Sequence, residues 1–339
     1  MDRTIYDVAH EAGVSISTVS RALNNTGYVS EKTRAKIEAA MNGFYPNAAA
    51  KAMMTKRSNV IGVVSFLSPK RFFLSGTLSN SLAGILDYTK QNDYQVTLDI
   101  GSADFNCIEM YRKKQIDAII FISYMSNPEL IKQIHELKIP VAFMGDTITK
   151  DDELRVQINN KRGAFEAVEY LISLGHRRIA LINGRRFNPP SENRYSGFLA
   201  ALLNAEIVPD ESLVVFCEES IEEHAYRAAM KLLQMPNRPT AIFAYNDDMA
   251  MGVYHAAREL NIAIPEQLSV IGFDDSKVAS LVFPPLTTVA QPSYYKGFLV
   301  AEKMITYLRS LENGQTDIPS SELLECKLIV RDSCSQSAI

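Results

Sequence analysis

From Asn59 onward, short apolar runs alternate with stretches of helical periodicity, and this alternation restricts the fold more than any other feature of the chain. Apolar runs bounded by polar segments predict buried strands, and helices between them predict parallel connections. The predicted strands are Val60–Phe66, Gln95–Ile100, Ala118–Ile122, Val141–Met144, Ile179–Ile182, Leu213–Phe216, Ala241–Ala244 and Val270–Phe273. The helices between them include Asn80–Gln91, Arg162–Leu174, Ala225–Leu233 and Met249–Leu260. Two such series predict two lobes, each built on a doubly wound parallel sheet.

Polar residues follow several of these strands. Asn246 follows one predicted strand, Asp274 follows the next, and Arg194 lies near the start of a helix. Ligands of doubly wound sheets bind beyond the carboxyl ends of the strands, which indicates a site between the lobes. Amide, carboxylate and guanidinium groups beside aromatic rings suit a sugar or another small polyhydroxylated ligand.

The first 58 residues differ from the rest in charge. They carry eight Lys and Arg against five Asp and Glu, whereas the whole chain has a net charge of -4. A basic head on an acidic body indicates a polyanionic partner for the head alone. A chance imbalance is the alternative for so small an excess.

The head has the pattern of three short helices. The apolar spacing of Ile5–Ala12 predicts the first helix, Gly13 ends it, and Ser15 can cap the second. A third helix is predicted over Glu31–Met41, with Ser30 as its cap. Two helices joined by a tight turn containing glycine form a helix-turn-helix, and a serine-rich three-helix cap is the alternative.

Residues 13–23, G-V-S-I-S-T-V-S-R-A-L, contain four hydroxyl side chains, one arginine and no acid. A recognition helix enters a groove lined by phosphates, which excludes acids. Hydroxyls can bond phosphates or base edges, and Arg21 can bond guanine O6 and N7. The stretch therefore predicts a DNA-binding helix.

The head resembles the LacI/GalR family of bacterial transcription regulators in T-I-Y-D-V-A-H-E-A-G-V-S-I-S-T-V-S-R-A-L-N and in G-Y-V-S-E-K-T-R. The body shares S-L-G-H-R-R-I-A-L-I, Y-N-D-D-M-A-M-G, S-V-I-G-F-D-D and P-P-L-T-T-V-A-Q-P with it. The resemblance implies a cytoplasmic homodimeric repressor that binds a near-palindromic double-stranded DNA operator and needs no cofactor. A small effector, a sugar or sugar derivative, would control its operator affinity from between the lobes.

The resemblance also implies roles for individual residues. Ile16 and Ser17 would read bases, with Arg21 as a further base contact, and Ile16 would contact a thymine methyl or exclude a wrong base by shape. The phosphate contacts would be Thr4, Ser15, Thr18, Ser20, Asn24 and Tyr28. A linker helix over Asn47–Met54 would contact DNA through Asn47, Ala50 and Met53, with Met53 wedged into the minor groove. The effector contacts would be Arg194, Asn246 and Asp274, with the aromatic candidates Phe72, Phe73 and Tyr294.

The expected fold class is a small all-α helix-turn-helix head plus an α/β two-lobe body like a periplasmic binding protein, with two doubly wound parallel sheets. The expected domains are the head at 1–45, the hinge helix and linker at 46–58, the N-terminal lobe at 59–157 plus 287–319, and the C-terminal lobe at 158–286 plus 320–334.

The chain departs from the family pattern at the cleft or its rim. The Asp expected after the strand that ends at Met144 is Gly145, with Asp146 one place later. The usual V-x-x-D-N is V-Q-I-N-N, which ends in Asn159 and Asn160, and the segment 102–115 is several residues short. The ligand of a relative therefore cannot simply be transferred to this chain.

The sequence also allows two other functions. An enzyme could use the acid pairs Asp247/Asp248 and Asp274/Asp275, but adjacent residues rarely point the same way and no nucleophile motif accompanies them. No catalytic or metal-binding residue is therefore predicted. A secreted sugar-binding protein would fit the two lobes, but the basic head and the absence of a signal-peptide pattern oppose it. No apolar run reaches the ~18 residues of a membrane span.

Several candidates also have a structural interpretation. Asp247 could cap a helix beginning at Met249, and Asp275 could be a cap beside Asp274. The rings of Phe72 and Phe73 could belong to the core, and His176 at a helix-to-strand turn is expected to be structural. The four cysteines are widely spaced, which predicts free thiols.

Overall fold

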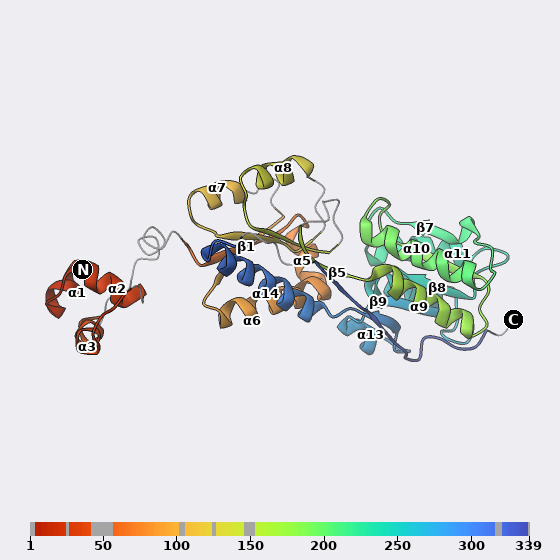
Figure 1. Cartoon of the computed structure of the whole chain (residues 1–339). Coiled ribbons are helices and arrows are strands. Elements are labelled where there is room, and N and C mark those ends of the chain that lie inside the picture. Colours follow the sequence, from red (N-terminus) through yellow and green to blue (C-terminus); the bar gives the residue numbers. More distant parts are fainter. Residues whose placement is uncertain are drawn as a thin grey trace. The chain divides into compact units, whose positions relative to one another are not determined.

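The computed structural model describes residues 4–24, 27–41, 57–101, 106–123, 127–145, 153–315 and 321–337 (Figure 1). The predicted linker helix, with Asn47, Ala50 and Met53, lies outside these residues, as does the side chain of Asn24. The head and the two-lobed body are each described by themselves.

The head consists of three helices: α1 (Ile5–Ala12), α2 (Ile16–Asn24) and α3 (Glu31–Ala40). Gly13 ends α1 in the left-handed region, at φ 63°, where a side chain would be disfavoured. The hydroxyl of Ser15 accepts the Thr18 amide at 3.2 Å and begins α2, and the hydroxyl of Ser30 accepts the Thr33 amide at 3.3 Å and begins α3. The predicted helix starts and caps are confirmed.

One apolar side of each head helix forms a common core. Its buried members are Val8, Ala9, Ala12, Val19, Ala22, Ile37 and Ala40. The Arg34 guanidinium donates to the Ala22 carbonyl at 3.2 Å and so joins α3 to the last turn of α2. Because one face of α2 packs into this core, its opposite face points away from the core.

The first lobe of the body is built on a parallel sheet in the order β11-β5-β4-β3-β1-β2. Its strands are β1 (Val60–Ser65), β2 (Gln95–Ile100), β3 (Ala118–Phe121), β4 (Val141–Met144), β5 (Leu154–Ile158) and β11 (Glu322–Leu324). The accompanying helices are α5 (Pro69–Leu74), α6 (Gly76–Gln91), α7 (Cys107–Arg112), α8 (Pro128–Glu136) and α14 (Ser293–Glu312). Figure 1 shows α6 and α14 lying together on one face, where they share a core with β1, β3, β4 and β5.

The second lobe has a sheet in the order β12-β10-β9-β8-β6-β7, parallel except for β12. Its strands are β6 (Ile179–Asn183), β7 (Val214–Phe216), β8 (Ala241–Ala244), β9 (Ser269–Asp274), β10 (Thr287–Ala290) and β12 (Lys327–Ile329). Its helices are α9 (Asn160–Ser173), α10 (Pro189–Asn204), the 3-10 turn Glu211–Leu213, α11 (Glu222–Leu233), α12 (Asp247–Glu259) and α13 (Lys277–Leu281). Helices α9 and α10 cover one face of this sheet, and α11 and α12 cover the other.

The chain crosses between the lobes three times: from β5 to α9, from β10 to α14, and from β11 to β12. The lobe boundaries expected at 287 and 320 are therefore wrong. The strand over 287–290 pairs with β9 in the second sheet, and the strand over 322–324 pairs with β5 in the first. These two crossovers come a few residues later than predicted, because a short apolar strand carries no local mark of the sheet that it joins.

Candidate functional site

The outward face of α2 is the candidate DNA-binding surface. Ile16, Ser17 and Arg21 are exposed, with Ile16 at 39%, while Val19 and Ala22 on the opposite side are buried. The structure thus brings the three predicted base-reading side chains to one accessible face.

The described phosphate candidates lie around this face at helix ends and on a loop. Thr4 precedes α1 and donates from its amide and its hydroxyl to Asp7, at 2.7 Å each. Ser15 contacts the hydroxyls of Ser17 and Thr18 at 2.7 and 2.8 Å, and Tyr28 is 92% exposed. Of the remaining candidates, Thr18 and Ser20 are half-buried on α2.

The candidate effector site is a pocket of about 330 Å³ between the two lobes. The first lobe contributes the starts of α6 and α14, and the second contributes the turn after β9. The crossover from β10 to α14 forms part of the wall. The lining residues are Gly76, Thr77, Asn80, Asp274, Asp275, Ser276, Ala290, Gln291, Pro292, Ser293, Tyr294 and Tyr295.

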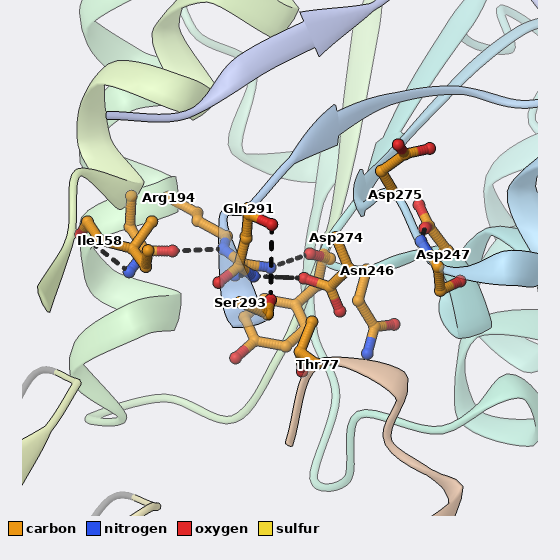
Figure 2. A network of polar contacts seen from close by, with 12 residues as sticks. Thr77, Ile158, Arg194, Asn246, Asp247, Asp274, Asp275, Gln291 and Ser293 are labelled. Carbon is orange, nitrogen blue, oxygen red and sulfur yellow. Dashed lines mark hydrogen bonds and ion pairs between the residues drawn. The ribbon is translucent and has the colours of Figure 1, made fainter. Parts of the chain in front are cut away.

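Arg194, on α10, is buried at the centre of the polar network in Figure 2, with 4% of the residue exposed. Its guanidinium donates to Asn160 Oδ1 at 2.9 Å and to the Tyr245 carbonyl, and lies 3.8 Å from Asp274 Oδ1. It also stacks 3.6 Å from the centre of the Phe273 ring. The guanidinium of Arg194 therefore makes its contacts within the protein, whereas the family resemblance implied only a contact with the effector.

Asp274 ends β9 and lines the pocket with its side chain 16% exposed. The amide of Gln291 donates to Asp274 Oδ1, the same oxygen that the Arg194 guanidinium approaches, so both contacts fall on one oxygen of the carboxylate (Figure 2). Burial raises the pKa of Asp274 to about 6, and the Arg194 charge and the Gln291 hydrogen bond oppose that shift. The free lone pairs of such a carboxylate can accept hydrogen bonds from ligand hydroxyls.

Gln291 was not among the predicted site residues, although it belongs to the quoted P-P-L-T-T-V-A-Q-P motif. Thr77 and Asn80, at the start of α6, were also missed. In the sequence they lie about 200 residues from the residues of the second lobe that line the pocket, and only the packing of the two lobes brings them to it. The motif was the available signal for Gln291, and no local pattern marked the other two.

Asn246 caps α12 by accepting the Met249 amide at 2.8 Å on its side-chain oxygen. The interpretation of Asp247 as the cap is therefore wrong, since Asp247 is the first residue of the helix and its carboxylate turns inward. Asp275 is paired with Arg331 at 2.6 Å and makes no helix cap. Asn246 remains half-buried beside the carboxyl end of β8, where its amide group stays a candidate ligand contact.

The three aromatic candidates occupy different environments. Phe72 is fully buried in the first-lobe core, which contradicts its predicted contact with an effector. Phe73, the next residue on the short helix α5, is 59% exposed. Tyr294 lines the pocket, and its hydroxyl donates to Asp87 at 2.8 Å. One step along a helix turns a side chain by about 100°, so one of two adjacent phenylalanines enters the core.

His176 contacts Thr240, Ser269 and the Ser335 carbonyl at 2.9–3.1 Å and is buried at the far end of the second sheet, in agreement with a structural role. All four cysteines are free thiols, as predicted. The described residues contain no cluster of His, Cys, Asp and Glu arranged for a metal ion. Within the same residues, no helix combines the length and apolarity that crossing a membrane requires.

A helix-turn-helix head followed by two α/β lobes with a polar pocket between them defines a DNA-binding regulator with an effector-binding body. Residues 4–47 match the family described as bacterial regulatory proteins, lacI family, and residues 168–334 match the periplasmic binding protein-like domain. The HTH-type transcriptional regulator DegA of Bacillus subtilis is 37% identical, over 99% of both chains.

Two solved structures are similar over almost the whole chain. The lac repressor dimer bound to operator and the anti-inducer ONPF is 26% identical with a TM-score of 0.83, covering 99% of this chain and 100% of that one. The CelR–cellobiose complex is 27% identical with a TM-score of 0.72, covering 98% and 99%. The chain belongs to the LacI family of bacterial regulatory proteins, whose members regulate transcription and are not enzymes. The predicted fold class is confirmed.

Proposed function

We propose that the protein is a cytoplasmic transcriptional repressor whose affinity for a near-palindromic operator is set by a small polyhydroxylated effector, a sugar or sugar derivative. The observation that carries the proposal is the pocket between the lobes, where Arg194 and Gln291 hold the carboxylate of Asp274 at the wall. An apolar ligand would cover the remaining lone pairs of this carboxylate without a hydrogen bond, whereas a hydroxylated ligand can donate to them.

The similar proteins support this ligand class. CelR was solved with cellobiose and the lac repressor with ONPF, in folds that match this chain almost end to end. The pocket of this chain presents Thr77, Asn80 and Ser276 besides Asp274 and Gln291. These are hydrogen-bonding groups that suit several hydroxyls on one ligand.

We further propose that two copies of the chain bind the operator as a homodimer, since a near-palindromic site requires two-fold related heads. The lac repressor is a dimer on its operator in the similar structure. Effector binding would favour one arrangement of the lobes and thereby change the spacing of the heads. This requires that the effector bind the two arrangements unequally.

Calorimetric titration tests the effector site, with a panel of D-ribose, D-galactose, D-galacturonate, cellobiose and adenosine added to the purified full-length chain. Binding of at least one compound is expected, with loss of that binding in Asp274→Ala. Wild-type affinity in Asp274→Ala would show that this pocket is not the effector site.

Light scattering at micromolar concentration tests the assembly. It should give the mass of two chains, and the mass of a tetramer would contradict the proposed homodimer.

Selection of bound sequences from random DNA, followed by anisotropy titrations, tests the head. Arg21→Ala should relax the preference at one base position per half-site, since each specific base contact contributes ~1–3 kcal/mol. Lys36 is an exposed cation on α3 and supplies the matched control. Lys36→Ala should leave the sequence preference unchanged. If both variants change the sequence preference equally, Arg21 acts through its charge and not through a base contact.

A further inference from the structure

Asp247 is a buried acid that the effector site described above does not use. It is the first residue of α12, only 1% of it is exposed, and it lies beneath the turn that follows β9. Its two oxygens accept hydrogen bonds from different segments, the Ser276 amide at 2.6 Å and the Thr288 hydroxyl at 2.5 Å. A buried carboxylate is kept only where such partners stabilise it, so the arrangement requires a reason.

The turn that Asp247 contacts is strained. Asp274 has φ 119° and Asp275 has φ 53°, both in a region that residues with a side chain seldom adopt. The amide held by Asp247 belongs to Ser276, the next residue along the chain. A strained backbone persists only where its surroundings hold it, and here the first strained residue is the one that presents its carboxylate to the pocket.

The second contact of Asp247 reaches the strand that leads out of the lobe. Thr288 lies in β10, three residues before Gln291, the side chain that donates to Asp274. The Thr288 hydroxyl also accepts the Asp275 amide at 3.4 Å. One carboxylate thus joins the turn that carries Asp274 to the strand that carries its partner Gln291.

The close approach of Asp247 to the sheet is built into the sequence. Gly272 of β9 lies directly under the carboxylate, and a Cβ at that position would overlap Asp247 Oδ1. Glycine weakens a strand, so its presence in the middle of β9 fits a place where another group must approach the backbone. Burial raises the pKa of Asp247 to about 7, with the charge of Asp274 adding to the shift.

We propose that Asp247 is a positioning residue for effector binding, which holds the strained Asp274–Asp275 turn against β10 so that Asp274 and Gln291 meet the ligand in a fixed geometry. The proposal rests on the proposed function of the pocket. It predicts that Asp247 affects effector affinity without touching the effector and without altering the head.

The test titrates full-length variants with the five compounds of the panel. Asp247→Ala removes both acceptors, and effector affinity should fall about tenfold or more. Asp247→Asn keeps one acceptor oxygen and should recover part of that loss. The matched control is Asp248→Asn, the neighbouring acid in the same first turn. Asp248 is exposed and its charge raises the pKa of Asp274, so its removal should not lower effector affinity.

A double variant separates positioning from a general effect on the fold. If Asp247 acts through Asp274, then Asp247→Asn added to Asp274→Ala should change the remaining affinity by less than about twofold. A purely structural role would instead add its full loss in both backgrounds. Thr288→Val removes one of the two donors, and should give a smaller loss of affinity if Asp247→Ala fails to fold.

A measurement without ligand completes the test. Hydrogen exchange at the Ser276 amide should accelerate in Asp247→Asn and not in Asp248→Asn, while exchange in β8 stays at the wild-type rate. Unchanged exchange at Ser276, or wild-type affinity in Asp247→Asn when Asp274→Ala binds weakly, would overturn the inference. Wild-type affinity in Asp274→Ala would instead refute the effector site itself.

Discussion

Replacement of Arg194 by methionine tests whether this side chain is part of the protein framework as well as part of the ligand site. Methionine keeps an unbranched stem that can pack beside Phe273, and it removes the guanidinium. The variant loses the hydrogen bonds to Asn160 Oδ1 and the Tyr245 carbonyl, together with the ion pair to Asp274. We expect a substantial loss of stability even in the absence of effector.

The size of the loss can be worked from these contacts. A buried acceptor that loses its donor costs about 1–3 kcal/mol, and two are affected. Asp274 would lose its cation, but it can bind a proton instead. The pKa of about 6 includes the lowering effect of the Arg194 charge, so without that charge Asp274 binds a proton more readily, which limits this contribution. Two acceptors at about 1–3 kcal/mol each give about 2–6 kcal/mol, a range that contains the ~3–5 kcal/mol typical of a broken buried ion pair.

For a body of two lobes, 3–5 kcal/mol corresponds to a fall in Tm on the order of 10 °C. Differential scanning calorimetry of the full chain at pH 7 measures it, beside the double variant Arg194→Met/Asp274→Asn. The double variant leaves no unpaired charge, so its Tm should fall by less than the sum of the two single changes. A Tm of Arg194→Met within about 2 °C of wild type would refute the reasoning, because the guanidinium would then contribute nothing to the fold.

Three further predictions concern stability. The pKa of Asp247 is about 7 in the folded chain against an ordinary 3.8, so the folded chain binds an extra proton between these values and the stability of the wild type falls as pH rises from about 4 to 7. Asp247→Asn lacks this titration, so its Tm should lie closer to that of the wild type at pH 8 than at pH 5. A Tm difference that is the same at both pH values would contradict the burial argument. Gly84→Ala should lower stability by about 1–3 kcal/mol in urea unfolding, since a Cβ there would overlap the backbone of Tyr294 and Phe298 where α6 meets α14; an unchanged urea midpoint would show that the helices can separate. Ser30→Ala should cost the head about 1 kcal/mol by removing the acceptor for the Thr33 amide. Amide hydrogen exchange in the first turn of α3 should accelerate, and wild-type exchange rates there would argue against the cap.

The sequence by itself determined the elements whose signals are local. Hydrophobic periodicity marked the three head helices, and the caps Ser15 and Ser30 with the left-handed Gly13 marked where they begin and end. The buried runs over 60–65 and 241–244 were recognisable as strands because both faces of a central parallel strand are apolar. The outward face of α2 followed from the same periodicity, since Val19 and Ala22 define its inner side.

The tertiary structure alone decided everything that depends on which distant segments meet. Membership of the strand over 287–290 in the second sheet, the burial of Phe72 beside an exposed Phe73, and the contacts of Arg194 all depend on partners far along the chain. Asn246 and Asp247 are adjacent acceptors that could each cap α12, and packing over Gly272 turned Asp247 inward. A local pattern specifies backbone conformation, but long-range packing selects the partner of each polar side chain.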